Sequence, residues 1–159
     1  MGVFYHAQVC MNGHMISDAI EIEQDLMSNY CSKCGSKTIT KCPACNGEIR
    51  GFYYVEGLAS FEETTVPSYC HICGNSYPWT LSAIEALSSL IQNDEKTTTE
   101  QKKSVIESIP DILHETPKTQ EAASKFKRFL SASGKFTQEF ALKLLVTIAG
   151  ETAKGTLFP

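Results

Sequence analysis

The sequence lacks the features that send a chain into or across a membrane. Its longest apolar stretch, FALKLLVTIAG at residues 140–150, is interrupted by Lys143 and is shorter than the roughly 20 residues that a bilayer span needs. The N-terminus, MGVFYHAQVC, has no basic segment followed by an apolar core, so it does not match a secretory signal. His6 stands where the N-terminal acylation pattern needs Ser or Thr. We therefore expect a cytoplasmic protein.

The sequence also lacks recognisable catalytic patterns. It has no Gly-rich phosphate loop, no paired catalytic carboxylates and no Ser/His/Asp grouping. His6 and His114 stand alone, without a nucleophile or a carboxylate that the sequence assigns to them. We expect that the protein is not an enzyme.

Cysteine, in contrast, is abundant in the first half and absent from the second. Six of the seven cysteines form three C-x-x-C pairs, CSKC, CPAC and CHIC, and the seventh begins the segment CMNGH, whose histidine supplies a fourth pair. Four pairs make enough ligands for two closed tetrahedral zinc sites, whereas disulfides would leave one cysteine over. We predict two structural Zn²⁺ ions and these ligands: Cys10, His14, Cys31, Cys34, Cys42, Cys45, Cys70 and Cys73.

Flexible residues accompany every pair. Gly35, Asn46-Gly47 and Gly74 follow the second cysteine of a pair, and Asn12-Gly13 lies inside the first pair. Such residues suit tight turns whose backbone N–H groups point at thiolate sulfurs. We favour sequential grouping of the pairs, in which the first two pairs hold one ion and the last two hold the other. A cross-braced and a nested arrangement both stay open.

A sequentially grouped chain forms two zinc ribbons, in which β-strands bring the ligand pairs together. Residues 15–23, MISDAIEIE, alternate in part, and residues 51–57, GFYYVEG, are aromatic and rich in β-formers, so both predict strands. We expect the aromatic residues of the second segment, Phe52, Tyr53 and Tyr54, to form the core. Four-ligand, mostly thiolate sites leave zinc little Lewis acidity, which favours a structural role over a catalytic one. A redox role for CPAC is disfavoured because no strand–helix unit surrounds it.

The charge of the first half argues against binding to phosphate. Residues 1–79 carry four basic and eight acidic side chains, and residues 80–159 carry ten of each. Seven thiolates and two Zn²⁺ ions bring the first half to a net charge of about −7. The notable basic cluster lies further on, where acidic neighbours indicate a solvated helix face. Its residues are Lys125, Lys127, Arg128 and Lys135.

Helical periodicity dominates the second half. Thr97 with Glu100 forms a predicted capping box, Pro110 is expected to break that helix, and Thr116-Pro117 resembles an N-cap followed by a first helical residue. Trp79, just before the first helix, is expected to pack the ribbon against it. The four predicted helices span about residues 80–92, 97–109, 116–134 and 136–154. The inward side of the last helix is predicted to hold Phe140, Ala141, Leu144, Leu145 and Ile148.

Three segments together resemble a known bacterial family. AQVCMNGHMIS, YCSKCGSKTITKCPACNGEIRGFY and YCHICGNSYPWT are similar to small double-zinc-ribbon proteins catalogued as domain of unknown function 2321, and TPKTQEAASKFKRFL with ETAKG resembles the helical region of that family. The resemblance implies a bacterial or phage-borne cytoplasmic protein with ribbons first and helices after. It also supports the eight ligands named above, and it implies no activity.

These observations predict an α+β fold. Two N-terminal zinc ribbons made of short antiparallel β hairpins occupy a domain of residues 1–79, and a bundle of about four short helices occupies a domain of residues 80–159. The predicted function is a non-enzymatic adaptor that binds another protein, with homo-oligomers possible and no membrane span. The alternative is a nucleic-acid-binding ribbon protein that uses Lys37, Lys41, Arg50 and the basic cluster.

Overall fold

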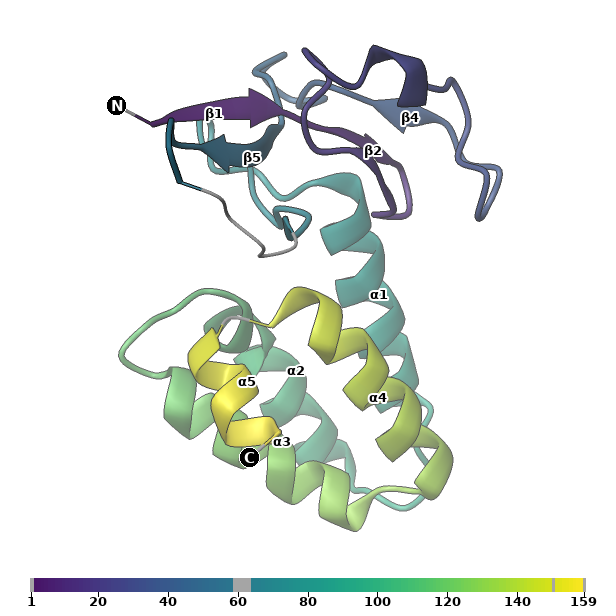
Figure 1. The fold of residues 1–159 in the computed structure, drawn as a ribbon. Helices are drawn as coiled ribbons and strands as arrows, with labels where there is room; N and C mark the ends of the chain where they lie inside the picture. The colour runs from purple at the N-terminus through teal and green to yellow at the C-terminus, as the bar shows by residue number, and fades with distance from the viewer. Residues whose placement is uncertain (1, 59–63, 150, 159) are drawn as a thin grey trace. The chain divides into compact units, whose positions relative to one another are not determined.

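Five short strands in two small antiparallel sheets make up the N-terminal part of this computed structural model (Figure 1), which describes residues 2–58, 64–149 and 151–158. In one sheet β1 pairs with β5, and in the other the order is β3-β2-β4. The strands are β1 (Val3–His6), β2 (Gln8–Cys10), β3 (Met15–Ser17), β4 (Thr38–Ile39) and β5 (Arg50–Tyr54).

The predicted strand at residues 51–57 corresponds to β5, but the one at residues 15–23 is mostly wrong. Only its first three residues form β3, and a short 3-10 helix, η1 (Gln24–Leu26), follows. Gly51 is needed in β5 because a Cβ there would lie 1.9 Å from the carbonyl oxygen of Asp18. The same carbonyl accepts the N–H of Phe52 at 2.8 Å, so the Asp18 loop rests directly on the strand.

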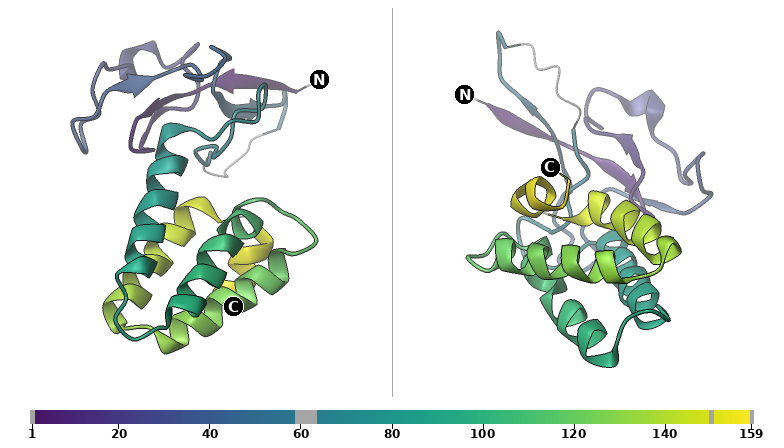
Figure 2. Two further views of the ribbon diagram at one scale, coloured as in Figure 1. Left: turned by 180° about the vertical axis from the view of Figure 1, so that it is seen from behind. Right: turned by 90° about the horizontal axis from the view of Figure 1, so that it is seen from below.

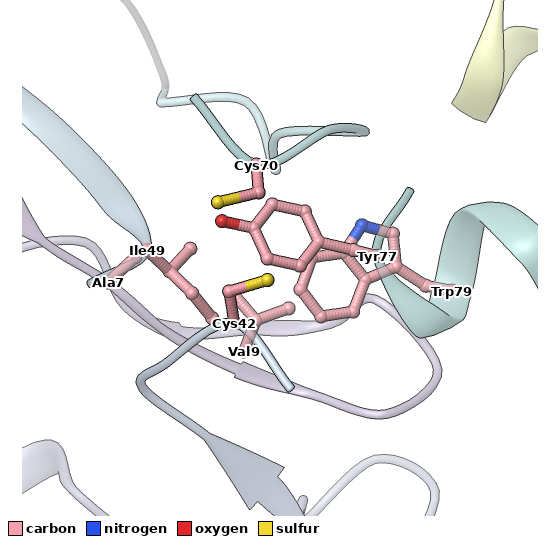
Figure 3. Packing of buried hydrophobic residues seen from close by; sticks show 7 residues of the cluster. All are labelled: Ala7, Val9, Cys42, Ile49, Cys70, Tyr77 and Trp79. Carbon is pink, nitrogen blue, oxygen red and sulfur yellow. The ribbon is translucent and has the colours of Figure 1, made fainter. Parts of the chain in front are cut away.

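A small core lies beneath the strands and includes cysteines (Figure 3). Tyr77 and Trp79 stack in it, with ring centroids 4.7 Å apart, and the Trp79 indole N–H donates to the carbonyl oxygen of Pro67 at 2.8 Å. Trp79 is only 8% exposed, so the prediction that it packs inside is confirmed. The cluster consists of Ala7, Val9, Cys42, Ile49, Cys70, Tyr77 and Trp79.

The aromatic residues of β5 do not belong to that core. Tyr53 is 48% and Tyr54 39% exposed, so the prediction that these residues form the core is wrong. The core is instead filled by residues on either side of the cysteine pairs, by two of the cysteines, and by the rings of Tyr77 and Trp79, which flank the first residue of α1 (Pro78–Gln92). The β1–β5 sheet has two strands, and so small a unit has too little chain to cover both faces of that sheet. The β5 aromatics therefore stay at the surface.

Helices make up the rest of the chain (Figure 2). The whole chain divides into two units, residues 1–82 and 83–159. The two units do not test the predicted domains, so that division stays a prediction. The described residues hold five helices rather than about four, because the last predicted helix is divided near residue 150. Besides α1 they are α2 (Thr99–Leu113), α3 (Thr119–Ala132), α4 (Lys135–Ile148) and α5 (Glu151–Leu157).

Each helix buries one apolar side, and α3 packs against both α2 and α5. One predicted inward position of the last helix is wrong, since Phe140 of α4 is 43% exposed. The predicted α+β class, with strands and cysteine pairs first and helices after, is confirmed. None of the helices in the described ranges has the length and apolar character of a membrane span.

Candidate metal centres

The eight predicted ligands lie in two groups of four, each with its ligand atoms within 4.8 Å of one another. The grouping is sequential, and neither the nested nor the cross-braced arrangement occurs. We call them the first group, Cys10, His14, Cys31 and Cys34, and the second group, Cys42, Cys45, Cys70 and Cys73.

The distances inside each group fit a tetrahedron around zinc. Zn–S bonds of about 2.3 Å and Zn–N bonds of about 2.0–2.1 Å give tetrahedral edges of about 3.8 Å between sulfurs and about 3.6 Å between sulfur and nitrogen. In the second group the Cys42–Cys73 and Cys45–Cys70 sulfurs lie 3.8 and 3.7 Å apart. In the first group, His14 Nδ1 lies 3.5 Å from one cysteine sulfur and 3.6 Å from another.

The three C-x-x-C pairs adopt one turn. In each, the N–H of the first cysteine donates to the carbonyl five residues on, and its carbonyl accepts the N–H four residues on. The residue directly after the second cysteine has a positive φ each time. These residues are Gly35 (φ 72°), Asn46 (φ 61°) and Gly74 (φ 73°). Glycine and asparagine tolerate this left-handed backbone, so the sequence repeats the turn three times.

The remaining pair, Cys10 and His14, forms a different turn at the end of β2. Its backbone is closed by the Cys10 N–H, which donates to the His14 carbonyl at 3.0 Å, and the His14 N–H points at the Cys10 sulfur at 3.3 Å. Gly13 (φ 84°) sits between them, where a Cβ would lie 3.0 Å from the Cβ of Trp79. The turn is therefore pressed against the core.

Burial differs between the two members of each C-x-x-C pair. The first cysteines, Cys31, Cys42 and Cys70, are buried, whereas the second ones are exposed. Cys10 is fully buried. Each group thus has one side in the core and one side at the surface, so a bound ion would join the turns to the core.

Thiol acidity shows what the groups need. Hydrogen bonds from Ser36 lower the pKa of Cys34 to about 5, and the Cys73 backbone N–H lowers the pKa of Cys70 to about 6. The Gly47 N–H also lowers the pKa of Cys45, but loss of water and the neighbouring sulfurs outweigh it and raise that pKa to about 12. Backbone donors therefore favour the thiolate at Cys34 and Cys70, whereas loss of water and the neighbouring sulfurs oppose it at Cys45. A divalent cation removes that conflict.

Two side chains near the groups were not recognised from the sequence as part of a site. Asn12, interpreted there as a turn residue, points its side-chain N–H₂ at the Cys34 sulfur at 3.5 Å and donates to the Ser36 hydroxyl at 2.8 Å. The hydroxyl of Tyr77 faces Cys70 (Figure 3). No sequence signal marks either, because the contacts join segments 22 and 7 residues apart through the fold.

The other histidines and the basic cluster lie outside the groups. His6, which the sequence left alone, pairs with Glu21 through its ring and its backbone N–H, so its assignment as isolated is wrong. In the basic cluster Lys125 forms an ion pair with Glu121 at 2.9 Å, as expected of a solvated helix face.

Comparison with known proteins finds one family. A family model described as "Uncharacterized protein conserved in bacteria (DUF2321)" matches residues 3–157. Comparison with curated proteins and with solved structures finds no match.

Proposed function

The chain belongs to the bacterial family DUF2321, and we propose that it is a non-enzymatic adaptor in which two structural zinc ribbons present a protein-binding surface. The observation that carries the proposal is an exposed aromatic face beside two closed donor sets.

Zinc is supported by the donor set and its spacing. Three thiolates with one imidazole, and four thiolates, are the ligand sets of structural Zn²⁺ sites, and the sulfur–sulfur distances of 3.7–3.8 Å match the tetrahedral edge. Each set supplies four protein ligands, which leaves no coordination position for a water or a substrate. A filled shell of this kind supports a structural role and a non-enzymatic protein.

Native mass spectrometry of the purified protein tests the metal. We expect two zinc ions per chain in the parent protein. In His14→Ala we expect the second group to keep its ion and the first group to hold its ion weakly, because the change removes a ligand from the first group only. A protein that carries one ion or none would contradict the two-ribbon proposal. Equal loss of both ions in His14→Ala would contradict two separate centres.

The surface lies on the β1–β5 sheet. Phe4 and Tyr53 are directly opposite each other in the register, their ring centroids are 4.6 Å apart, and they are 41% and 48% exposed. The guanidinium carbon of Arg50 lies 4.5 Å from the Phe4 ring centroid. Gly2 lies against the hydroxyl end of Tyr53, where a Cβ on Gly2 would overlap the hydroxyl oxygen. We call Phe4, Arg50 and Tyr53 the aromatic face.

A protein partner fits this face better than a nucleic acid does. Tyr and Arg are among the residues that most often carry binding energy at protein interfaces, and both side chains here are held in contact with the Phe4 ring, which lowers the entropic cost of binding. Of the basic residues invoked for nucleic acid, Lys41 is paired with Glu48 at 3.1 Å and Arg50 is stacked on Phe4. The surrounding unit is acidic, which opposes phosphate. The chemistry favours a partner that offers an apolar side chain and a carboxylate for Arg50.

Capture of proteins from a bacterial lysate on the immobilised full-length protein tests the aromatic face. The parent protein is compared with variants inside and outside that face. We expect Tyr53→Ala and Arg50→Ala to lose a captured protein that the parent retains. Tyr54→Ala is the matched control, because Tyr54 neighbours Tyr53 on the strand but lies on the opposite face, 39% exposed.

Three results decide the matter. Loss of the same protein in both face variants but not in the control supports the adaptor. Equal capture by all variants contradicts this face as the docking surface. Capture that disappears on nuclease treatment and weakens steeply with salt would favour the nucleic-acid alternative.

A further inference from the structure

Tyr77 places a polar atom, its hydroxyl oxygen, in the buried core of the N-terminal unit. The residue is 1% exposed, and its ring is stacked on Trp79. Its hydroxyl oxygen is buried and has no hydrogen-bond partner of normal geometry among the described residues. A buried hydroxyl without a partner costs about 1–3 kcal/mol, so a natural core rarely keeps one without an acceptor nearby.

A candidate acceptor is a cysteine sulfur of the second group. The Tyr77 hydroxyl faces the sulfur of Cys70 (Figure 3). Two backbone groups already point at Cys70, the N–H of Ile72 at 3.5 Å and the N–H of Cys73. Both come from the exposed side of the turn, whereas the Tyr77 hydroxyl approaches from the core.

The backbone of Tyr77 holds the ring in this place. Its N–H donates to the carbonyl oxygen of Ser68 at 3.0 Å, and its own carbonyl accepts the N–H of Thr80 at the start of α1. Pro78 follows as the first helical residue, with the fixed φ that a helix start needs. The position of the ring is therefore fixed by hydrogen bonds of the Tyr77 N–H and carbonyl groups and by stacking on Trp79.

We propose that Tyr77 is a positioning residue of the second metal centre: its hydroxyl donates a hydrogen bond to the thiolate of Cys70 when that sulfur binds a metal ion. The inference rests on the proposed metal binding but not on the adaptor role. A thiolate is a much better acceptor than a neutral thiol, so metal binding satisfies the buried hydroxyl. The hydrogen bond in turn removes charge from the sulfur and fixes its direction.

The two centres then differ in how they hold their ions. In the first group the side-chain donor is Asn12, which points at Cys34 from the exposed surface. In the second group the donor is the buried Tyr77, where water cannot replace it. Removal of either donor should therefore affect only the centre that it contacts.

Tyr77→Phe tests the proposal, because it keeps the ring and removes only the hydroxyl. Zinc transfer from the full-length protein to a chromophoric chelator is followed over time, with Asn12→Ala to mark the phase of the first centre and Tyr54→Phe as an exposed control. Loss of an outer-shell partner typically weakens metal affinity at least about tenfold, so we expect Tyr77→Phe to speed, by about tenfold, the phase that Asn12→Ala leaves unchanged. In the Co²⁺-substituted protein the thiolate-to-metal charge-transfer band should move to longer wavelength.

Several results would overturn it. Release rates and a Co²⁺ spectrum equal to the parent's would do so even if the melting temperature fell, because that pattern reports core packing alone. If Tyr77→Phe and Asn12→Ala accelerate the same phase of zinc release, the proposed assignment of Tyr77 to the second centre is wrong. A parent protein that binds no ion in native mass spectrometry would refute the metal proposal itself, which keeps the two failures apart.

Discussion

At the scale of single residues, backbone conformation explains which residue each turn requires. The sequence suggested that both Asn46 and Gly47 supply flexibility after Cys45, but only Asn46 has a positive φ. It occupies the place that Gly35 and Gly74 hold in the other two pairs. Asparagine is the non-glycine residue best suited to this conformation, so the turn is preserved without glycine.

Asn46→Ala should therefore weaken the second metal centre by about 1 kcal/mol, since alanine is strained in the left-handed region. Asn46→Gly should be within a few tenths of a kcal/mol of the parent. Chelator competition on the two variants measures the difference. Equal metal retention in Asn46→Ala and Asn46→Gly would show that the turn relaxes without cost.

Asp94 is the second residue whose role only the fold reveals. It is 5% exposed and lies between α1 and α2. Its carboxylate accepts hydrogen bonds from two segments far apart in sequence, which closes the helical unit. The donors are the backbone N–H groups of Lys96 and Gly134 and the hydroxyls of Thr97 and Thr137, at 2.8–3.1 Å.

These bonds make the contribution of Asp94 depend on pH. Burial alone would raise the pKa of Asp94, but the four donors outweigh it and lower that pKa from 3.8 to about 2. A lowered folded-state pKa stabilises the fold above the unfolded value, and this stabilisation is lost as pH falls from about 4 through about 2. The shift corresponds to at most about 2 kcal/mol.

Asp94→Asn should thus lower the free energy of unfolding by about 2 kcal/mol at pH 7 and by much less at pH 2. Urea unfolding followed by circular dichroism at 222 nm measures it at both values. Glu121→Gln is the control, since Glu121 forms an exposed ion pair with Lys125. Loss of such a pair should change the free energy of unfolding little. A difference between parent and Asp94→Asn that is the same at both pH values would contradict the account.

At the scale of elements, packing shifts the helix boundaries that local rules predicted. Pro110 was expected to end its helix, but α2 continues to Leu113. Ile112 and Leu113, beyond the proline, are buried, and their burial offsets the missing hydrogen bond of Pro110. Similarly, α3 begins at Thr119 rather than after Thr116, because the buried Thr119 hydroxyl donates to the Asp111 carbonyl oxygen at 2.8 Å.

The capping box of α2 is also displaced by one residue. Thr98 rather than Thr97 is the N-cap, and Gln101 rather than Glu100 completes the box. Thr97 instead points inward to Asp94. Both threonines satisfy the local pattern, and only the demand of the buried carboxylate distinguishes them.

Thr98→Ala should cost about 1 kcal/mol of stability, as the loss of a capping hydroxyl does. Thr99→Ala, the first residue inside the helix, should change little. Thermal unfolding monitored at 222 nm compares them. If Thr99→Ala costs as much as Thr98→Ala, the hydroxyl of Thr98 is not the cap that matters.

At the scale of the whole molecule, the two parts of the chain depend on different forces. The N-terminal unit has a core of a few side chains, several of them metal-group cysteines, whereas each helix buries an apolar side. A small core of this kind rarely supports a fold without a staple, so metal binding and folding of this unit should be one event.

Chelation should therefore unfold the N-terminal unit and leave most helical signal at 222 nm. The sequence contains one tryptophan, and it lies in the metal-linked core, so its fluorescence reports that unit alone. We expect a red shift of Trp79 emission when a strong chelator is added, reversed by zinc. Parallel loss of the fluorescence and helical signals would show instead that the helices also depend on the metal.

The sequence by itself determined which cysteines and histidine come together, the α+β class and the family. It could do so because cysteine spacing and turn residues are local features that can be read directly from the sequence. It also favoured the sequential grouping that the structure has. Only the tertiary structure decided that the β5 aromatics lie outside and that Tyr77 faces Cys70, as well as the partners of Asp94. These depend on which surfaces compete for a small core and on contacts between distant segments, and no local pattern encodes either.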